Sequence, residues 1–460
     1  VDVGSKRFLT NKVDRSVSGL VAQQQCVGPL HTPLSNVGVV ALSHLDTKGT
    51  LTAVGEQPIK GLINPQAQAR MTVAEGLTNL MFGVISDGGL RDVKASGNWM
   101  WAAKMDGEGA KMWHACVALK ACLLQLGPGI DGGKDSLSMA AKVNDETVKS
   151  PGQLTMTYYA SCPDVTLTIT PALQGGSSPS SHSSLLYIDL GQDKARLGGT
   201  ALSTVFSQIG NECADLEQPE LLVSLFNAVQ GMLKKRVLLA GHDRSDGGLI
   251  VTVIEMALAG NLGIEIDVPC VSLSAEKKDE GEGGEYGVPS AVLATLFNEE
   301  LGCVLEVLPE HETLVMEICA FSDPPLPCKK IGRVLHPTDD NGTHINIAVS
   351  GNKVFSSPVS ATRDTWESTS FELEALQCTA SCVKQEREYL INSPPGTGPR
   401  YHCSFTPTLT PDVILKAAPQ QKYKVAVVRQ EGSNGDREML AALHLAGFEA
   451  WDLNMNDLLV

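Results

Sequence analysis

Three breaks in composition divide the sequence into segments, and the first of them shows no periodicity. Residues 174–184 (QGGSSPSSHSS) and 275–287 (AEKKDEGEGGEYG) are rich in Gly, Ser or charged residues, and residues 356–421 centre on INSPPGTGPRYHCSFTPTLTPD. Such compositions are typical of linkers and surface loops. We interpret the first and third stretches as linkers and the second as a surface loop inside a domain.

The segments on either side of the first linker each mix helices and strands. In the first segment, residues 66–86 and 109–127 carry apolar residues at helical spacing, whereas 37–42 and 153–162 have strand patterns. The second segment is expected to contain strands at 185–190, 236–243, 302–307 and 344–351, and helices at 200–210, 219–236 and 248–260. The first of these helices would start at a Thr200 cap and stop at Gly210. This mixture predicts a fold of the α/β (α+β) class.

The last part of the sequence has a different order of elements. Residues 423–453 read as a strand, a glycine-containing turn, a helix and a second strand. This order is typical of the opening of a doubly wound parallel sheet.

Charge and composition exclude several classes of function. The chain has 36 basic and 52 acidic residues, a net charge of −16, which argues against a broad nucleic-acid-binding face. No run approaches the ~20 apolar residues that a membrane span needs. The 12 Cys residues are scattered without a C-x-x-C pair, which favours reduced thiols in a cytoplasmic protein. We expect both ends to be cut and the chain to be a fragment of a longer protein.

Two polar residues share one face of the expected helix at 66–86. Glu75 and Asn79 are four residues apart, so their side chains lie one above the other. A carboxylate and an amide oxygen so placed can share a hard cation such as Mg²⁺. The alternative is an ordinary polar helix surface.

The run GHDRSDGG (241–248) joins an apolar strand to an apolar helix. It places Asp243 and Asp246 at the end of a strand, where open α/β sheets bind ligands. Gly247 and Gly248 allow a close approach of the backbone to a phosphate or a cation. The alternative is that Ser245 or Asp246 only caps the helix.

Two further motifs carry polar residues that suit an anion or an interface. DGGKDSLSM (131–139) combines a flexible Gly132–Gly133 pair with Lys134, Asp135 and Ser136, without the spacing of a Walker A loop. SGNWMW (96–101) places Asn98 beside aromatic residues. The alternatives are a plain polar turn for residues 131–139 and aromatic packing for residues 96–101. RLGGTAL (196–202) suits an anion or plain helix capping equally.

Taken in order, these motifs resemble one enzyme family. They are NKVDRSVSGLVAQQQCVGP, TVAEGLTNL, SGNWMWAAK, GGKDSLSM, RLGGTAL, GHDRSDGGL and EGSNGDREMLAALHLAGFEAWD. Together they resemble the phosphoribosylformylglycinamidine synthases (FGAM synthases, or FGAR amidotransferases) of the large single-chain type, over nearly the whole chain.

The resemblance implies an architecture. Residues 1–173 and 185–355 would be the N-terminal-like and C-terminal-like α/β domains of one half of an aminoimidazole ribonucleotide synthetase-like core, here the second half. Residues 356–421 would be a linker, and 422–460 the truncated start of a class I glutamine amidotransferase domain. The first synthetase half and the rest of the glutaminase would be this chain's partners within the same protein.

The resemblance also implies an activity. Family members convert formylglycinamide ribonucleotide, ATP and glutamine into the amidine, ADP, phosphate and glutamate. ATP is thought to phosphorylate the amide oxygen, and ammonia from the glutaminase then displaces phosphate. The family's catalytic His and glutaminase Cys would lie outside this chain, so the fragment is expected to be inactive by itself.

The family's second half holds an auxiliary ATP or ADP with Mg²⁺. Carried over residue by residue, Lys6 and Ser245 would contact the nucleotide, and Glu75, Asn79 and Asp243 would ligate Mg²⁺. Asn36 stands where the family has Asp, so it would keep a carbonyl ligand but lose a charge.

The remaining motif residues and the alternative functions also follow from the resemblance. Residues Asn98, Gly133, Lys134, Asp135 and Ser136 would line the synthetase centre or the interface with the absent half. The alternatives are a non-catalytic, nucleotide-holding structural module, or another synthetase of the same superfamily.

Overall fold

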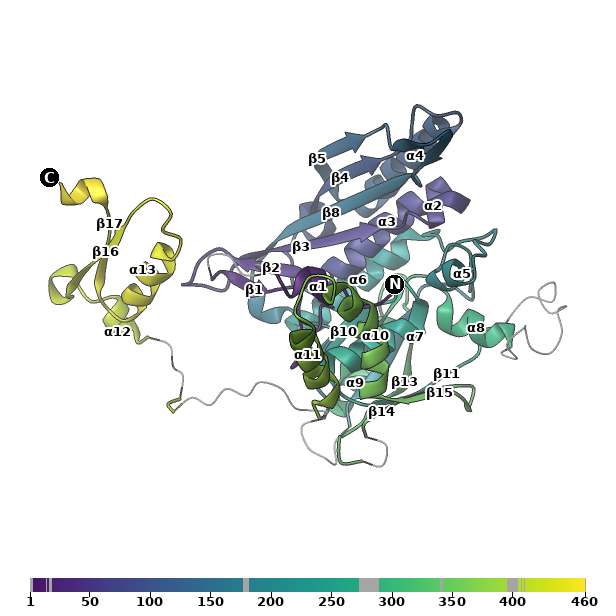
Figure 1. Ribbon diagram of the computed structural model, residues 1–460. Coiled ribbons are helices and arrows are strands. Elements are labelled where there is room, and N and C mark those ends of the chain that lie inside the picture. Colours follow the sequence, from purple (N-terminus) through teal and green to yellow (C-terminus); the bar gives the residue numbers. More distant parts are fainter. Residues whose placement is uncertain are drawn as a thin grey trace.

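Two mixed β-sheets backed by helices form the main body of the protein, and a small two-stranded unit stands apart from them (Figure 1). The computed structural model describes residues 3–13, 15, 19–176, 182–272, 289–339, 342–394, 404–406, 408 and 410–459. Much of the three interruptions expected from composition, at 177–181, 273–288 and 395–403, lies outside these residues. Among the described residues, no helix is long and apolar enough to span a membrane.

The first sheet has six strands, and two long helices cover it. Its strand order is β1 (Val21–Gln23), β2 (Gly38–Ala41), β3 (Gly49–Glu56), β8 (Gln153–Cys162), β4 (Lys94–Met100) and β5 (Gly129–Ser136). All neighbouring strands are antiparallel except the parallel pair β4–β5. The helices are α3 (Pro65–Leu80) and α4 (Glu108–Leu126). A hairpin of β6 (Ala140–Val143) and β7 (Glu146–Lys149) follows β5.

The start of helix α3 and its distance from the sheet both follow from particular residues in the sequence. The Asn64 side chain accepts hydrogen bonds from the first free N–H groups of the helix, and Pro65 occupies a position where no N–H is needed. Glycine then lets α3 approach the sheet closely, since a Cβ on Gly55 would lie 2.2 Å from the Thr72 carbonyl oxygen. The predicted helix at 66–86 is confirmed, but it ends at Leu80.

The second sheet has seven strands and is covered on both faces. Its order is β10 (Leu238–Asp243), β12 (Gly302–Val307), β9 (Ser184–Asp189), β13 (Cys328–Val334), β11 (Ile264–Val268), β14 (His344–Val349) and β15 (Asn352–Pro358), with β11 and β14 parallel. Leu186 and Ile188 of β9 face one core, and Leu185 and Tyr187 face the other. The covering helices are α6 (Pro219–Lys234), α9 (Pro309–Ala320) and α7 (Gly248–Gly260).

One apolar core joins the two sheets. It runs from β3, α3 and α4 through α6 to one face of β9 and β12. The second core lies between the other face of this sheet and α7. The shorter helices are α1 (Arg7–Thr10), α2 (Lys60–Ile63), α5 (Ala201–Val205), α8 (Ser290–Phe297) and α12 (Asp412–Leu415).

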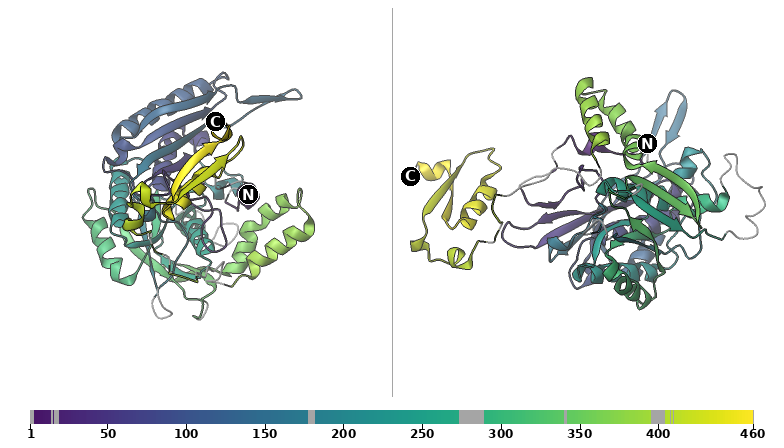
Figure 2. Two further views of the ribbon diagram at one scale, coloured as in Figure 1. Left: turned by 90° about the vertical axis from the view of Figure 1, so that its left-hand side faces the viewer. Right: turned by 90° about the horizontal axis from the view of Figure 1, so that it is seen from below.

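The structure differs from the linker expected over residues 356–421. Helices α10 (Val359–Glu374) and α11 (Ala380–Asn392) lie within that range and pack on each other beside the N-terminal residues (Figure 2). Phe371, Val383 and Leu390 form a small core with Leu30. The charge of Arg7 is neutralised by Glu367, at 2.9 Å between Nη2 and Oε1, with both side chains buried. These contacts span the length of the chain, so local composition did not reveal them.

The last unit matches the expected strand–helix–strand order. It consists of β16 (Lys424–Arg429), α13 (Asp436–Leu445) and β17 (Glu449–Asn454), and the two strands are parallel. Mixed sheets with covering helices, followed by this unit, confirm the predicted α/β class.

Candidate functional site

Glu75 and Asp243, two of the expected cation ligands, meet where α3 crosses the end of β10. The Thr78 hydroxyl, about one turn beyond Glu75, donates to the Glu75 carbonyl oxygen at 3.0 Å and lies 3.4 Å from Asp243 Oδ2. The carboxylate of Asp243 is close enough to help raise the pKa of Glu75. The fold therefore brings together two residues that are far apart in sequence. We call the carboxylates of Glu75, Asp243, Asp246 and Glu299 the acidic cluster.

Glu75 is a carboxyl group held in an environment that disfavours its charge. Burial raises its pKa well above the usual range, and the nearby charges of Asp246 and Asp243 raise it further. The opposing contributions are hydrogen bonds that Glu75 Oε2 accepts from the Glu56 N–H at 2.7 Å and from Gln57 Nε2 at 3.1 Å. A bound cation would relieve this repulsion and favour the ionised form.

Asp246 stands in the turn between β10 and α7. Although part of it reaches solvent, the surrounding protein and the charge of Glu299 raise its pKa to about 6, while Lys60 acts in the opposite direction. Asp246 thus keeps its proton to a higher pH than an ordinary aspartate, which adds a second carboxyl with weakened acidity to the cluster.

Lys60, at the start of α2, supplies an internal positive charge. Its Nζ lies 2.6 Å from Glu299 Oε2, and the two side chains are 2% and 1% exposed. Burial alone would lower the pKa of Lys60, but Glu299 and Asp246 outweigh it and raise that pKa. Lys60 also donates to Gln57 Oε1, which links it to Glu75 through Gln57.

His242 is a second buried cation beside Asp243. Its Nδ1 lies 2.7 Å from Asn36 Oδ1 and 3.3 Å from Asp243 Oδ1, and its Nε2 lies 3.0 Å from Glu255 Oε2. Burial lowers the pKa of His242, but Asp243 and Glu255 outweigh this and raise it to about 9. The imidazole is therefore protonated at neutral pH and partly neutralises these carboxylates.

The two amides expected as ligands differ in how much of their polar surface is engaged. Asn36 Oδ1 faces His242, and its Nδ2 donates to the Gly241 carbonyl at 3.1 Å. Asn79 Nδ2 donates to the Val54 carbonyl at 3.2 Å, which directs its amide toward β3. Asn36 would have to leave His242 before its carbonyl oxygen could ligate a cation.

The two residues expected to contact a nucleotide lie at the margin of the site. Ser245 follows β10 in the turn before α7, and it is partly buried. Lys6 is exposed, and its Nζ donates to the Gly4 carbonyl at 2.8 Å. The N-terminal segment passes near this turn, since Val3 lies against Gly247. Gly247 is the N-cap residue of α7, a position for which the sequence offered Ser245 or Asp246.

The expected interface residues lie together on a different part of the fold. Asn98 of β4 is in parallel register with Lys134 of β5, and Lys134 donates to Ser136. Residues 131–135 are all exposed on β5, the last strand of the first sheet. They form one edge of that sheet, whereas the acidic cluster lies between α3 and β10.

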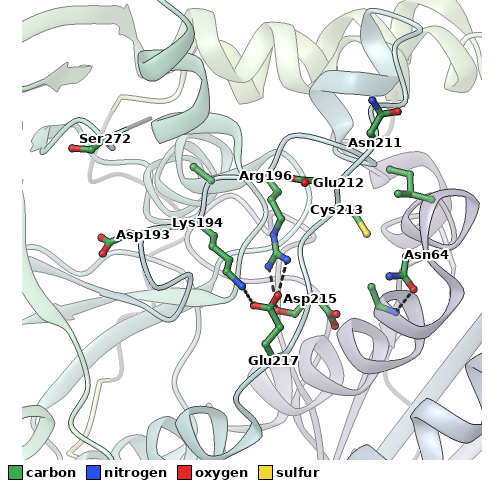
Figure 3. A pocket seen from close by; sticks show the side chains of 13 residues that line it. Asn64, Asp193, Lys194, Arg196, Asn211, Glu212, Cys213, Asp215, Glu217 and Ser272 are labelled. Carbon is green, nitrogen blue, oxygen red and sulfur yellow. Dashed lines mark hydrogen bonds and ion pairs between the residues drawn. The ribbon is translucent and has the colours of Figure 1, made fainter. Parts of the chain in front are cut away.

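A cavity of about 730 Å³ opens where the start of α3 meets residues 193–196 and 211–217, and no residue of the acidic cluster lines it (Figure 3). Both of its cations are already paired: Lys194 with Glu217, and Arg196 with Glu217 and Glu300. Asp193, Glu212 and Asp215 add further carboxylates to the lining. This balance of charge makes the cavity poorly suited to a phosphate.

The acidic cluster is not a complete cage for a metal ion. In the part of the chain that the structure describes, no three His, Cys, Asp or Glu side chains are grouped so that they could hold a metal. The oxygen donors of Glu75, Asn79 and Asp243 suit Mg²⁺ in type, and burial together with the charges of Asp246 and Asp243 disfavours the ionised form of Glu75 when no cation is bound. A cation here would need further oxygens from water or a ligand.

Sequence reasoning did not identify Lys60, Glu299 or His242 as parts of this site. Lys60 and Glu299 are single residues with no motif spacing, and their pairing spans 239 positions. His242 directly precedes Asp243 in the GHDRSDGG run. This adjacency was the one sequence feature that could have identified His242 as part of the site.

Three protein-family models match consecutive parts of the chain. They are described as an FGAR-AT PurM_N-like domain at residues 5–161, an AIR synthase related protein C-terminal domain at 184–344, and a CobB/CobQ-like glutamine amidotransferase domain at 422–460. The gaps between the matches are residues 162–183, which include most of the first interruption of composition, and residues 345–421, which include α10 and α11.

Curated relatives match the chain from end to end. The phosphoribosylformylglycinamidine synthase of Homo sapiens is 48% identical over 458 residues, which is 99% of this chain and 32% of the relative. The probable phosphoribosylformylglycinamidine synthase, chloroplastic/mitochondrial, of Arabidopsis thaliana is 47% identical over 99% of this chain and 30% of its own length. The chain thus spans about a third of the curated relatives that it matches.

A solved structure shares the fold. PurL of T. maritima, complexed with FGAR, aligns with a TM-score of 0.51 and 13% sequence identity over 72% of this chain and 48% of that one. The order of the family models and the full-length similarity agree with the motif pattern in the sequence. The chain belongs to the phosphoribosylformylglycinamidine synthase family.

Proposed function

We propose that this chain is part of an ATP-dependent ligase that converts formylglycinamide ribonucleotide and glutamine into formylglycinamidine ribonucleotide in purine synthesis. Within that enzyme the chain contributes the second synthetase half and the start of the glutaminase domain. Its own role is to hold an auxiliary ATP or ADP with Mg²⁺. The family's catalytic residues lie outside the chain, so by itself it does not turn over substrate.

The meeting of Glu75 and Asp243 is the observation that carries this proposal. Two carboxylates from separate domains share one site, where burial first, and then the charges of Asp246 and Asp243, disfavour the ionised form of Glu75. Glu75, Asn79 and Asp243 would hold Mg²⁺, and the nucleotide's phosphate oxygens would complete its coordination. Ser245 would contact the nucleotide from the turn, and Lys6 from the N-terminal segment. Asn36 would join only after releasing His242.

Thermal unfolding with and without ligand tests the auxiliary site. A ligand that binds only the folded state raises the melting temperature. We expect ADP with Mg²⁺ to stabilise the wild-type chain by about 2–3 kcal/mol at a hundredfold excess over Kd. Asp243→Asn and Glu75→Gln should abolish most of this ligand-dependent shift, because each removes an anionic ligand.

The matched control for these variants is Glu306→Gln. Glu306 is also a buried carboxylate, but it accepts hydrogen bonds from the Gln174 and Gly175 N–H groups away from the acidic cluster. This variant should melt at a lower temperature and keep the ligand-dependent shift. An unchanged melting temperature of the wild type in ADP and Mg²⁺ would rule out the auxiliary site.

The exposed edge of the first sheet is where we propose that the other synthetase half makes contact. Strand β5 ends that sheet, and the residues of its central part are exposed. An exposed strand edge is a template for pairing with another segment. We place Asn98, Gly133, Lys134, Asp135 and Ser136 at this contact, as part of the synthetase centre or beside it.

Two other functions are less well supported. A purely structural nucleotide holder describes this fragment but not its relatives, which are named as synthases. Another synthetase of the superfamily does not account for the glutamine amidotransferase match at 422–460. We assign the protein to the cytoplasm from its cysteine pattern; the plant relative is named chloroplastic/mitochondrial.

A further inference from the structure

Glu299 is a nearly inaccessible carboxylate whose two oxygens tie three segments together. Its Oε1 accepts hydrogen bonds from the Ala201 N–H at 2.8 Å and from the Gly247 N–H at 2.8 Å. Its Oε2 accepts one from Lys60 Nζ at 2.6 Å, and the side chain is 1% exposed. Glu299 thereby joins the starts of α5 and α2 to the turn that carries Asp246.

The segment that carries Glu299 also packs directly against this turn. A Cβ on Gly248 would lie 2.6 Å from the Asn298 carbonyl oxygen, and Gly248 has a φ of +71°. Only glycine fits such a conformation at such a distance. The turn and the Glu299 segment therefore hold each other in one arrangement.

Lys60 is the group whose position depends most on Glu299. A buried ammonium needs a counter-charge, and its four-carbon stem is flexible. Gln57 accepts a hydrogen bond from Lys60 Nζ and donates one to Glu75 Oε2 at 3.1 Å, so a single side chain links the ammonium to Glu75. The charges of Asp246 and Glu75, as well as that of Glu299, also act on Lys60 in the folded protein. If Glu299 lost its charge, Asp246 and Glu75 would be the remaining carboxylates that act on the ammonium.

We propose that Glu299 is a positioning residue that holds the Lys60 ammonium away from Glu75 and Asp246, so that these carboxylates stay open to an external divalent cation. This inference rests on the proposed function, because it concerns the same cation site. An ammonium placed on Glu75 or Asp246 would occupy the oxygens that a divalent cation needs. The ion pair between Lys60 and Glu299 thus determines whether the oxygens of Glu75 and Asp246 are available to a divalent cation.

A double-mutant cycle on the 460-residue chain tests this role, with Mn²⁺ as the probe. Binding is measured by electron paramagnetic resonance of free Mn²⁺ and by calorimetry, with and without ADP. We expect Glu299→Gln to weaken Mn²⁺ binding at least about tenfold, which corresponds to 1.4 kcal/mol. Adding Lys60→Met to that variant should return the affinity to within about threefold of wild type, since the competing ammonium is gone.

Glu306→Gln serves again as the control, since it removes a buried carboxylate that also accepts backbone N–H groups. It should lose stability and keep its affinity for Mn²⁺. A merely structural role for Glu299 predicts that the double variant binds as weakly as Glu299→Gln, and that result would overturn the inference. Unchanged binding in Glu299→Gln would do the same.

Two further outcomes separate this inference from the proposed function. A wild-type chain that binds no Mn²⁺, even with ADP, overturns both. If Glu299→Gln does not fold, Lys60→Met alone decides: binding at least as tight as wild type supports the role of Glu299, and weaker binding contradicts it.

Discussion

Asp246 illustrates how a single side chain makes the site sensitive to pH. Although part of the side chain reaches solvent, the surrounding protein and the charge of Glu299 raise the pKa of Asp246 to about 6. The folded protein therefore retains the Asp246 proton over a range in which the unfolded chain has released it. A raised carboxyl pKa favours the folded state at low pH, and that advantage is lost as pH rises from about 4 to about 6.

Replacing Asp246 with Asn should remove this pH dependence. We expect Asp246→Asn to gain stability relative to wild type between pH 4 and pH 7, by about 1 kcal/mol after solvent screening of the partly exposed group. Urea denaturation of both proteins across this range, without divalent cations, measures the difference. A constant difference at every pH would contradict the raised pKa.

The candidate ligands show what could be predicted at the level of single residues. Glu75 and Asn79 were found from their helical spacing, and Asp243 from its place at a strand end. Their convergence was expected only through the resemblance to the synthase family. Lys60 and Glu299 were not predicted, because nothing in the local sequence around either residue records a partner from another domain.

At the scale of elements, glycine determines how closely α3 approaches the first sheet. A Cβ on Gly76 would lie 2.4 Å from Tyr158 Cδ2, so alanine there must displace a buried aromatic ring. We expect Gly76→Ala to destabilise the protein by about 1–3 kcal/mol through overpacking. It should also weaken the ADP and Mg²⁺ shift, because Glu75 precedes Gly76 on the same helix.

Gly231 of α6 provides the matched control for Gly76. It is also a glycine inside a helix, but a Cβ there would meet nothing within 4 Å. Gly231→Ala should stabilise the protein by about 0.5–1 kcal/mol, because alanine has the better helix propensity. Thermal unfolding of the two variants compares them, and equal effects would show that the close contact at Gly76 is unimportant.

Elements with strong periodicity were predicted well, and those fixed by distant contacts were not. The helix at 109–127 is confirmed as α4, with Gly127 at its end in a left-handed conformation. The helix expected to start at Thr200 and stop at Gly210 is shorter, since α5 covers only Ala201–Val205. Helix α10 was hidden by a sequence that is rich in Ser and Thr.

Helix α10 connects the end of the second domain to the N-terminal segment through a buried ion pair. Arg7 and Glu367 form this tie with side chains that are 4% and 1% exposed. Removing one partner of a buried ion pair leaves an uncompensated charge. We expect Glu367→Leu to cost about 3 kcal/mol, and Arg7→Met added to it to recover part of that loss.

Chemical denaturation of these variants measures how much the Arg7–Glu367 pair contributes to the free energy of unfolding. Glu386→Gln is the control, since Glu386 pairs with Lys12 on the same pair of helices but is 29% exposed, and a surface pair contributes only about 0–1 kcal/mol. If Glu367→Leu costs no more than Glu386→Gln, the helices α10 and α11 do not stabilise the rest of the protein through this pair.

The ion pair between Arg7 and Glu367 has a consequence for how the protein folds during its synthesis. A ribosome adds about 5–20 residues each second, so roughly 20–70 s separate the synthesis of the two residues. Throughout that interval the guanidinium of the nascent chain has no carboxylate to meet at its native position. The helix α1 must therefore wait, without its buried partner, until the 360 positions that separate Arg7 from Glu367 have been translated.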